Sequence, residues 1–460
     1  MYPFGIGDIG KEVDGSTEKI KHSKEKALSQ SINEGSASSF SSSIGDSYIT
    51  PFALALNANP LQIGLLSSFS GLASPLSQLL GSRLMKKHSR KKIVLRFVFL
   101  QSLLWIPIAL LGILFYKNII PSSLPYLLII FFSLLIGIGG LAYPAWFSWM
   151  GDLVPAKDRG RYFSIRNTAT GIVGLAGVLI GAIVLDTFKK TGIVIIGFSI
   201  LFFSAFIFRL ISFSIFRKQY APKFKVQKGD YFSLFDFIKR FDNFGKFAVY
   251  QALFYFALMI GSPFFAVYML KELQFSYITF MIVTMSSSVF YLIFTPLIGK
   301  FSDKFGNVKL FYIYNICFAI SPILWIMFKS PIYLILFPQI LVGIANAAFV
   351  ISVINFTYDS VSPQKRGICV AYSNLLSGVG IFLGSILGGF LVNTYHPSSI
   401  NPFIFIFLIT AGARLLVALL FIPKIKDARP VERLPPMRIH LVHPFRTLNA
   451  EIGWFKAIFK

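Results

Sequence analysis

One acidic residue stands in a serine-rich, otherwise uncharged stretch near the start of the chain. Asp46 has Ser43, Ser47, Tyr48 and Thr50 around it. An ionisable side chain inside a membrane-spanning run is costly, so it generally has a partner or a function. Removal from water favours the neutral carboxyl group, so Asp46, with Tyr48 beside it, could bind a proton or a cationic part of a ligand. A structural pairing of Asp46 with an arginine or with the serines carries equal weight.

A second set of polar and aromatic side chains lies within or beside strongly apolar runs. Amides that face lipid would be penalised, so we expect them to point inward, either lining a cavity or bonding helix to helix. The set comprises Asn167, Gln251, Tyr255, Asn346, Asn355, Tyr143 and Trp146. Arg209 and Arg414 lie close to the ends of their runs, where long side chains usually reach for the membrane surface as anchors. Asp186 is expected to face water.

The motifs of several enzyme classes are missing from the sequence. There is no Gly-x-x-x-x-Gly-Lys-Ser/Thr loop, no His-Glu-x-x-His pair and no Gly-x-Ser-x-Gly elbow. Cys317 and Cys369 lie far apart in apolar stretches and suggest neither a disulfide framework nor a metal site. We therefore expect no enzymatic activity, no cofactor and no bound metal.

The elements that must position these residues are membrane-spanning helices. The chain is 55% hydrophobic and contains 51 Phe, and only 14% of its residues are charged, whereas soluble proteins average about 25%. Its mean hydropathy is +0.68, so lipid must surround much of the surface. The sequence predicts an all-α integral membrane protein with twelve spans, near 36–56, 60–84, 93–116, 123–150, 162–186, 191–216, 244–270, 275–299, 308–328, 331–357, 367–391 and 401–423.

The basic residues indicate an orientation. The net charge is +25, and most Lys and Arg fall in alternate loops, on the side that holds the N-terminus. This asymmetry predicts an even number of spans with both termini in the cytoplasm, in the plasma membrane. It also explains the basic composition without nucleic acid as a partner. The mixed-charge N-terminal segment lacks the apolar core of a signal peptide.

The two halves of the chain repeat each other. At an offset of 207 residues, identical residues align around the fourth and fifth spans: Asp152 with Asp359, Arg159 with Arg366, Asn167 with Asn374, and Gly171, Gly177 and Gly181 with Gly378, Gly384 and Gly388. Such matches indicate duplication. We expect tails at 1–35 and 424–460, six-helix bundles at 36–216 and 244–423, and a linker at 217–243, with interfacial helices in the linker and over 445–460.

A loop motif then connects the chain with a known family. Gly299-x-x-x-Asp303-Lys304-x-Gly306-x-x-Lys309 resembles the loop signature of the major facilitator superfamily, and the segment from Trp149 to Asn167 resembles the loop between the fourth and fifth helices of its prokaryotic members. The resemblance covers nearly all of 36–423. It implies two six-helix bundles around a central cavity, alternating access and no cofactor.

The resemblance also implies a latch at the cytoplasmic face, in which a loop acid binds an arginine or a helix N-terminus. Asp303 is the matching acid. Asp152 with Arg159 or Arg161, and Asp359 with Arg366, are further candidates for this network. In the first half, Met85 replaces the acid, so we expect the second half to carry more of the latch.

The leading hypothesis is a monomeric permease that moves a small solute of unknown identity by secondary active transport. It could couple this movement to protons through Asp46. One alternative is a membrane sensor or scaffold that transports nothing. Another is a translocator of lipids or other amphiphiles through a cavity that opens to the bilayer. Flux in liposomes would separate the three.

Overall fold

The computed structural model describes residues 15–85, 87–154, 159–222, 237, 242–395 and 401–432. The interfacial helices expected within 217–243 and over 445–460 fall largely or wholly outside these residues. In the first half, the helices are α1 (Gly15–Gly45), a 3-10 turn η1 (Asp46–Tyr48), α2 (Ile49–Ala55), α3 (Pro60–Leu84), α4 (Arg90–Tyr116), η2 (Pro121–Ser123), α5 (Leu124–Leu153), α6 (Arg159–Lys190) and α7 (Val194–Lys218).

The second half repeats this plan with two interruptions. Its helices are α9 (Asn243–Gly261), α10 (Phe264–Val267), η4 (Tyr268–Glu272), α11 (Tyr277–Phe305), α12 (Asn307–Met327), α13 (Pro331–Leu334), η5 (Ile335–Gln339), α14 (Ile340–Ser360), α15 (Pro363–Thr394), α16 (Pro402–Phe421) and η6 (Ile422–Lys424). The segments η4 and η5 are π-helical. Such wide turns are uncommon and often occur at functional sites.

Sequence signals begin several of these helices. Asn59 accepts a hydrogen bond from the backbone N–H of Gln62, whose side chain accepts one from the N–H of Asn59, and Pro60 follows at the first helical position of α3. Ser89 and Ser276 cap α4 and α11 in a similar way. Each cap binds a backbone N–H that the helix cannot satisfy itself.

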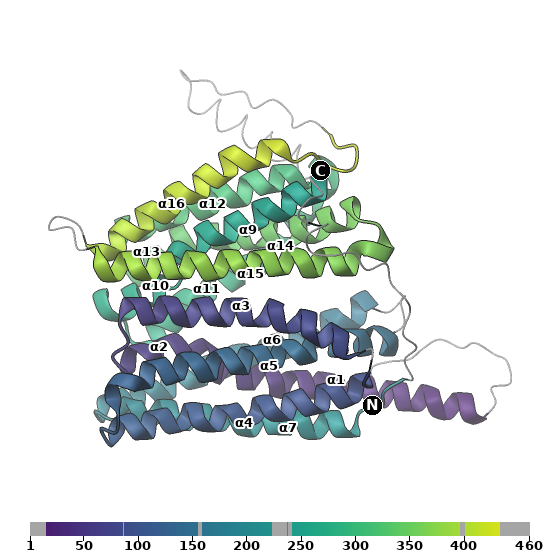
Figure 1. Ribbon diagram of the computed structural model, residues 1–460, viewed down its shortest axis with the longest axis horizontal. Helices are drawn as coiled ribbons and strands as arrows, with labels where there is room; N and C mark the ends of the chain where they lie inside the picture. Colours follow the sequence, from purple (N-terminus) through teal and green to yellow (C-terminus); the bar gives the residue numbers. More distant parts are fainter. Residues whose placement is uncertain are drawn as a thin grey trace.

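The helices form two bundles that meet along α3 and α15, which run side by side through the middle of the molecule (Figure 1). Small residues permit this contact. A Cβ atom on Gly64 would lie 2.5 Å from the carbonyl oxygen of Ser385 and 2.9 Å from Cα of Gly389. The Ser68 hydroxyl donates to the Phe382 carbonyl at 2.9 Å across the same interface. Within the first bundle, α1 packs on α6 and α7.

Among the described residues, eleven helices are long and apolar enough to cross a membrane. Large apolar side chains are exposed on them, for example Leu419, Leu292 and Phe147, which are 70%, 67% and 64% exposed. The serine-rich α1, with η1 and α2, is not among these eleven, and it lies within the first bundle. The predicted all-α fold of two six-helix bundles is confirmed, and the chain is a multi-pass membrane protein.

The first span extends further than its composition predicts. We expected it to begin at 36, but α1 is continuous from Gly15 to Gly45. Ala27, Ser31 and Glu34 are 0%, 0% and 2% exposed. This part of α1 is polar yet buried, because its hydrophilic side chains face other helices rather than lipid. The helix α1 begins, and α16 ends, at the same end of the bundle, which we call the terminal face (Figure 1).

Candidate functional site

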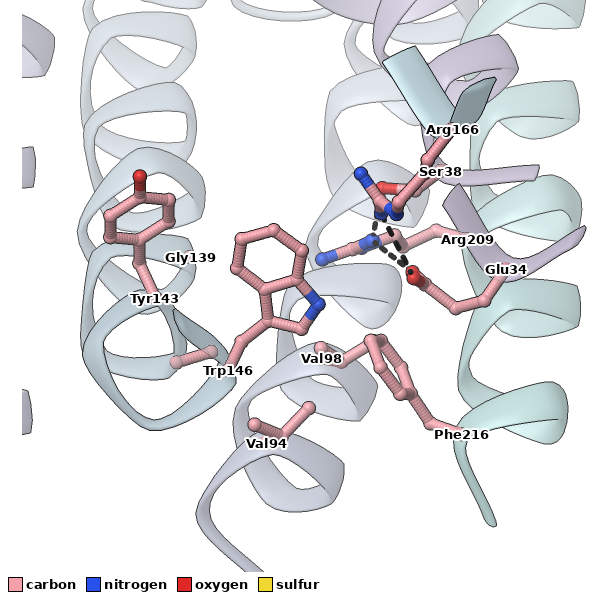
Figure 2. A pocket seen from close by; sticks show the side chains of 11 residues that line it. Glu34, Ser38, Val94, Val98, Gly139, Tyr143, Trp146, Arg166, Arg209 and Phe216 are labelled. Carbon is pink, nitrogen blue, oxygen red and sulfur yellow. Dashed lines mark hydrogen bonds and ion pairs between the residues drawn. The ribbon is translucent and has the colours of Figure 1, made fainter. Parts of the chain in front are cut away.

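A buried cluster of charges lies in the first bundle, where α1, α6 and α7 meet. The Glu34 carboxylate lies 3.6 Å from Nη2 of Arg166 and 4.0 Å from Nη1 of Arg209, and it accepts a 2.8 Å hydrogen bond from the Ser212 hydroxyl. Nε and Nη2 of Arg209 donate to Oε1 of Gln101 at 2.9 and 2.7 Å. Figure 2 shows the side chains of Glu34, Arg166 and Arg209 converging. We call Glu34, Arg166 and Arg209 the Glu34 cluster.

The Glu34 cluster forms one wall of a cavity of about 220 Å³. Two of the predicted cavity residues, Tyr143 and Trp146 on α5, form the facing wall (Figure 2). The Arg166 guanidinium lies over the Trp146 ring, 5.1 Å from its centre. A cation held over an aromatic face keeps unused N–H donors available to a ligand. The arrangement can therefore bind a small polar molecule.

Two of these charges do not match the sequence-based expectation. Arg209 was expected to reach for the membrane surface, but it points into the bundle because Glu34 and Gln101 lie there. Glu34 itself was assigned to the tail. A signal was present: Ser31, Glu34 and Ser38 follow one another at three- and four-residue spacing and so share one face of a helix. A buried carboxylate between two guanidinium groups is compensated electrostatically, which allows all three to remain inside.

Asp46 lies where α1 stops. Gly45 ends the helix against the Trp105 ring, which a Cβ atom at this position would meet at 2.4 Å, and Asp46 begins the 3-10 turn. Oδ1 of Asp46 is enclosed by the protein and has no hydrogen-bond partner among the described residues. The Ser42 hydroxyl lies within hydrogen-bonding reach of the same carboxyl group.

Tyr48, the second sequence candidate, is fully buried and donates a hydrogen bond to the Val178 carbonyl of α6. Gly181 gives the Tyr48 ring its space, since a Cβ atom there would lie 2.5 Å from the ring. The glycines of α6 thus serve close packing of α1, η1 and α6 at this level.

The remaining cavity candidates are dispersed. The Ser373 hydroxyl donates to Oε1 of Gln251 at 2.8 Å, and Nδ2 of Asn355 donates to the Ser302 hydroxyl at 3.1 Å. Both bonds join neighbouring helices. The Tyr255 ring packs edge-on against Phe349, with ring centres 5.7 Å apart. Asn346 is half-buried and Asn167 is exposed.

At the terminal face, the segment that follows α16 packs against the second bundle. Oδ1 of Asp427 accepts hydrogen bonds from the backbone N–H groups of Asn307 and Val308, at 2.8 and 3.1 Å. These N–H groups open α12, so Asp427 compensates the positive end of that helix. We call residues 425–432 the strap. Gly306 lies under it with φ of 91°, and a Cβ atom there would meet Oδ2 of Asp427 at 2.6 Å.

Asp303, the acid expected to do this work, is exposed, and no ion pair or hydrogen bond joins it to the described part of the chain. Its neighbours in the motif do meet the strap: Nζ of Lys309 donates to the Glu432 carbonyl at 2.8 Å, and the Glu432 N–H donates to the Lys304 carbonyl at 3.1 Å. Gly299 has open space around it. The motif thus forms the end of α11 and the start of α12, with Gly306 between them, and its acid does not cap the second helix.

Among the described residues, Asp152 and Asp359 meet partners other than the expected ones. Oδ2 of Asp152 lies 2.6 Å from Nη1 of Arg90 on α4. Arg161 is exposed, and the Arg159 side chain lies outside the described residues. Oδ2 of Asp359 accepts from Nδ2 of Asn307 at 3.1 Å and lies 3.7 Å from Nε of Arg429 in the strap.

Arg366 instead donates to the carbonyls of Tyr358 and Val361, both at 3.1 Å, and covers the Tyr358 ring. A helix C-terminus presents unpaired carbonyls. A guanidinium one turn into the next helix can donate to these carbonyls instead of pairing with an acid. Sequence spacing alone could not decide between the two partners.

Asp186 joins the two bundles at the face opposite the termini. Its Oδ1 and Oδ2 accept hydrogen bonds from the backbone N–H groups of Tyr277 and Ile278, at 2.9 and 3.0 Å. Asp186 is on α6, whereas these N–H groups open α11 of the other half. Asp186 was expected to face water; it is half-exposed and also binds this helix N-terminus, which attracts a carboxylate. Contacts between α2 and α10 lie on the same face.

Comparison with known proteins identifies this architecture. The sequence model described as Major Facilitator Superfamily matches residues 35–242 and again 247–458. The chain belongs to the Major Facilitator Superfamily. The double match corresponds to the two repeated bundles, and the resemblance seen in the loop motifs is confirmed.

Solved structures of transporters share the fold of this superfamily member. The nucleoside transporter NupG is 17% identical, with a TM-score of 0.62, over 88% of this chain and 100% of that one. A bacterial homologue of the iron transporter ferroportin is 15% identical in its inward-facing state, with a TM-score of 0.66, over 86% of this chain and 98% of that one. Its outward-facing state gives a TM-score of 0.54.

Among curated sequences, vacuolar basic amino acid transporter 2 of Saccharomyces cerevisiae is 33% identical over 101 residues, which are 22% of this chain and 21% of that protein. The match thus spans about a fifth of the relative's length. Membership of this superfamily, together with these transporter relatives, supports the leading hypothesis of a secondary transporter of a small molecule.

Proposed function

We propose that this transporter couples solute movement to protons and that Asp46 is the residue that binds the proton. The carrying observation is the enclosed Oδ1 of Asp46, which has no donor among the described residues. In a charged carboxylate at this position, Oδ1 would lack both water and a donor, at a large cost in free energy. The neutral acid suits the enclosed site, and rehydration of Asp46 in another conformation would favour release of the proton.

The described conformation is the one open toward the terminal face. Two observations support this part of the proposal. Asp186 and the packing of α2 on α10 join the bundles at the opposite face. The chain also fits the inward-facing ferroportin homologue better than the outward-facing one, with TM-scores of 0.66 and 0.54. The terminal face is then the cytoplasmic one, as the distribution of basic residues predicts, in the plasma membrane and with one chain as the working unit.

The solute enters the cavity beside the Glu34 cluster. Arg166, Trp146 and Tyr143 supply a cation and two aromatic surfaces there, a combination that suits a small polar solute. Arg209 belongs to the Glu34 cluster and also acts electrostatically on Asp46. A change of charge at Asp46 would therefore be felt at the solute cavity, which is the requirement for coupling.

The test compares two kinds of flux in proteoliposomes. A panel of amino acids, nucleosides and small carboxylates first identifies a transported solute by its uptake under an imposed pH gradient. We expect Asp46→Asn to abolish gradient-driven accumulation while solute exchange across the membrane continues, because exchange needs no net proton movement. Asp303→Asn, the same chemical change at an exposed acid, should leave both unchanged.

Accumulation by Asp46→Asn at the level of the unchanged protein would remove Asp46 from the coupling mechanism. Stabilisation by a panel compound with no flux of any solute would favour a sensor. Movement of fluorescent lipids between leaflets, again without solute flux, would favour an amphiphile translocator.

A further inference from the structure

A second buried arginine, Arg414 of α16, lies in the opposite bundle without a compensating acid. It is 2% exposed. Its Nη1 donates to the Phe318 carbonyl and its Nη2 to the Leu258 carbonyl, the latter at 3.1 Å. A guanidinium has five N–H donors, and Nε has no partner among the described residues. The expectation that Arg414 reaches for the membrane surface was wrong.

The repeat makes this arginine informative. At an offset of 205 residues, Phe208-Arg209-Leu210 of α7 aligns with Ala413-Arg414-Leu415 of α16, so the two arginines occupy corresponding positions in the two halves. Glu34 lies within 4.0 Å of Arg209, whereas no described acid lies within ion-pair distance of Arg414. Two backbone carbonyls and the Phe318 ring, whose centre lies 5.9 Å from the guanidinium carbon, are its described partners. A lone buried cation of this kind favours the entry of an anion, since attraction between charges is stronger where water is excluded.

Arg414 lines a cavity of about 280 Å³ inside the second bundle. Among the described residues, no Asp or Glu lines it. Polar groups from the end of α9, from α11, from α12 and from η5 do so, and two of them, the Ser321 hydroxyl and the Gln339 amide, have no hydrogen-bond partner in the described chain. Gln339 is the last residue of the π-helical turn η5. Its amide N–H and the Ser321 O–H are donors, which is what an anion requires.

The rest of the cavity wall is apolar and aromatic. Phe265, Phe280 and Trp325 lie on it. Such walls disfavour strongly hydrated and multiply charged ions, whose loss of water one arginine could not offset. They accept a weakly hydrated monovalent ion or a carboxylate on a short carbon chain.

We propose that this cavity is a binding site for one monovalent anion, either chloride or the carboxylate group of a small solute, held by Arg414, Ser321 and Gln339. The site is separate from the Glu34 cluster, which lies in the other bundle. It does not depend on proton coupling through Asp46, so failure of that proposal leaves it intact.

Binding is measured on the purified full chain in detergent, with radioactive chloride as the probe and acetate as the competitor. We expect saturable chloride binding, one ion per chain. Displacement of chloride by millimolar acetate would identify carboxylates as an alternative occupant. Acetate without effect would assign the site to chloride alone. If acetate binds saturably and chloride neither binds saturably nor competes with acetate, the site would be assigned to a solute carboxylate.

Two variants test the residues. Arg414→Gln should abolish saturable binding. Because removal of this arginine could impair folding, Ser321→Ala combined with Gln339→Leu provides a second test that retains the charge; loss of hydrogen bonds to an ion should weaken binding by about tenfold or more. Arg217→Gln removes the same charge at an exposed position and should bind as the unchanged protein does. Absence of saturable binding of both anions, or equal binding by the double variant, would overturn the proposal.

Discussion

Substitution of Asp186 is the most direct way to shift the balance between the conformation open toward the terminal face and the one open toward the opposite face. Because it bonds the first N–H groups of α11 from the other bundle, at 2.9 and 3.0 Å, the contact exists only while the opposite face is closed. Asp186→Asn removes the charge and one of two acceptor oxygens. One hydrogen bond to a charged group contributes about 1.5–3 kcal/mol, and a carboxylate at a helix N-terminus about 0.3–1 kcal/mol.

Asp186 is half-exposed, so solvent reduces both contributions, and we take about 2 kcal/mol for the loss. That free energy corresponds to a shift of about thirtyfold in the ratio of the two conformations. Spin labels on cysteines at Lys190 and Lys271, both exposed at this face, would report it as a longer inter-label distance in a background with Cys317 and Cys369 replaced by alanine.

The controls separate the latch from a general effect of charge removal. Asp186→Glu keeps the carboxylate and should retain most of the short-distance population. Asp303→Asn removes an acid of the terminal face without a described partner and should leave the distances unchanged. If Asp186→Asn gave the distance distribution of the unchanged protein, the reasoning that Asp186 holds the bundles together would be refuted.

Three further predictions follow from the same contacts. Glu34→Gln leaves two buried guanidinium groups without an acid and should lower the free energy of unfolding by about 3 kcal/mol or more. Adding Arg209→Met should restore part of this stability, and thermal unfolding in detergent would measure both changes. An equal loss of stability in the single and double variants would contradict the pairing. Gly306→Ala places a side chain at φ of 91° and against Asp427, so it should lower the free energy of unfolding by about 2 kcal/mol and speed hydrogen exchange in the strap. Gly299 has open space around it, so Gly299→Ala should change neither quantity. Asp46→Asn should flatten the pH dependence of solute uptake, because the neutral amide mimics the protonated acid at every pH; a retained pH dependence would assign the titrating group elsewhere.

The fold was predictable because the apolar runs and the internal repeat extend along the whole chain. Runs of apolar residues predicted twelve spans, and eleven helices among the described residues are long and apolar enough to cross a membrane. The alignment of Asp152 with Asp359 indicated the two bundles. The first span was harder, since α1 hides serines and Glu34 by packing them on α6 and α7. The average composition of a helix does not show which of its faces is buried.

The site was less predictable than the fold, because partners of charged residues come from distant parts of the chain. Asp186 meets Tyr277, and Asp427 meets Asn307, across separations that no local pattern specifies. Arg209 and Arg414 look alike in the sequence, yet only Arg209 has an acid beside it. Tyr143 and Trp146 were found because aromatic residues on one helix face share a wall by simple helical spacing.

Proton movement that accompanies solute transport tests the central proposal most directly. Proteoliposomes that hold a pH-sensitive dye, with no imposed pH gradient, receive a solute that the panel has identified. The account predicts a solute-dependent pH change inside the vesicles, lost in Asp46→Asn although solute exchange persists. Uptake of the solute by the unchanged protein without any change in internal pH would contradict it.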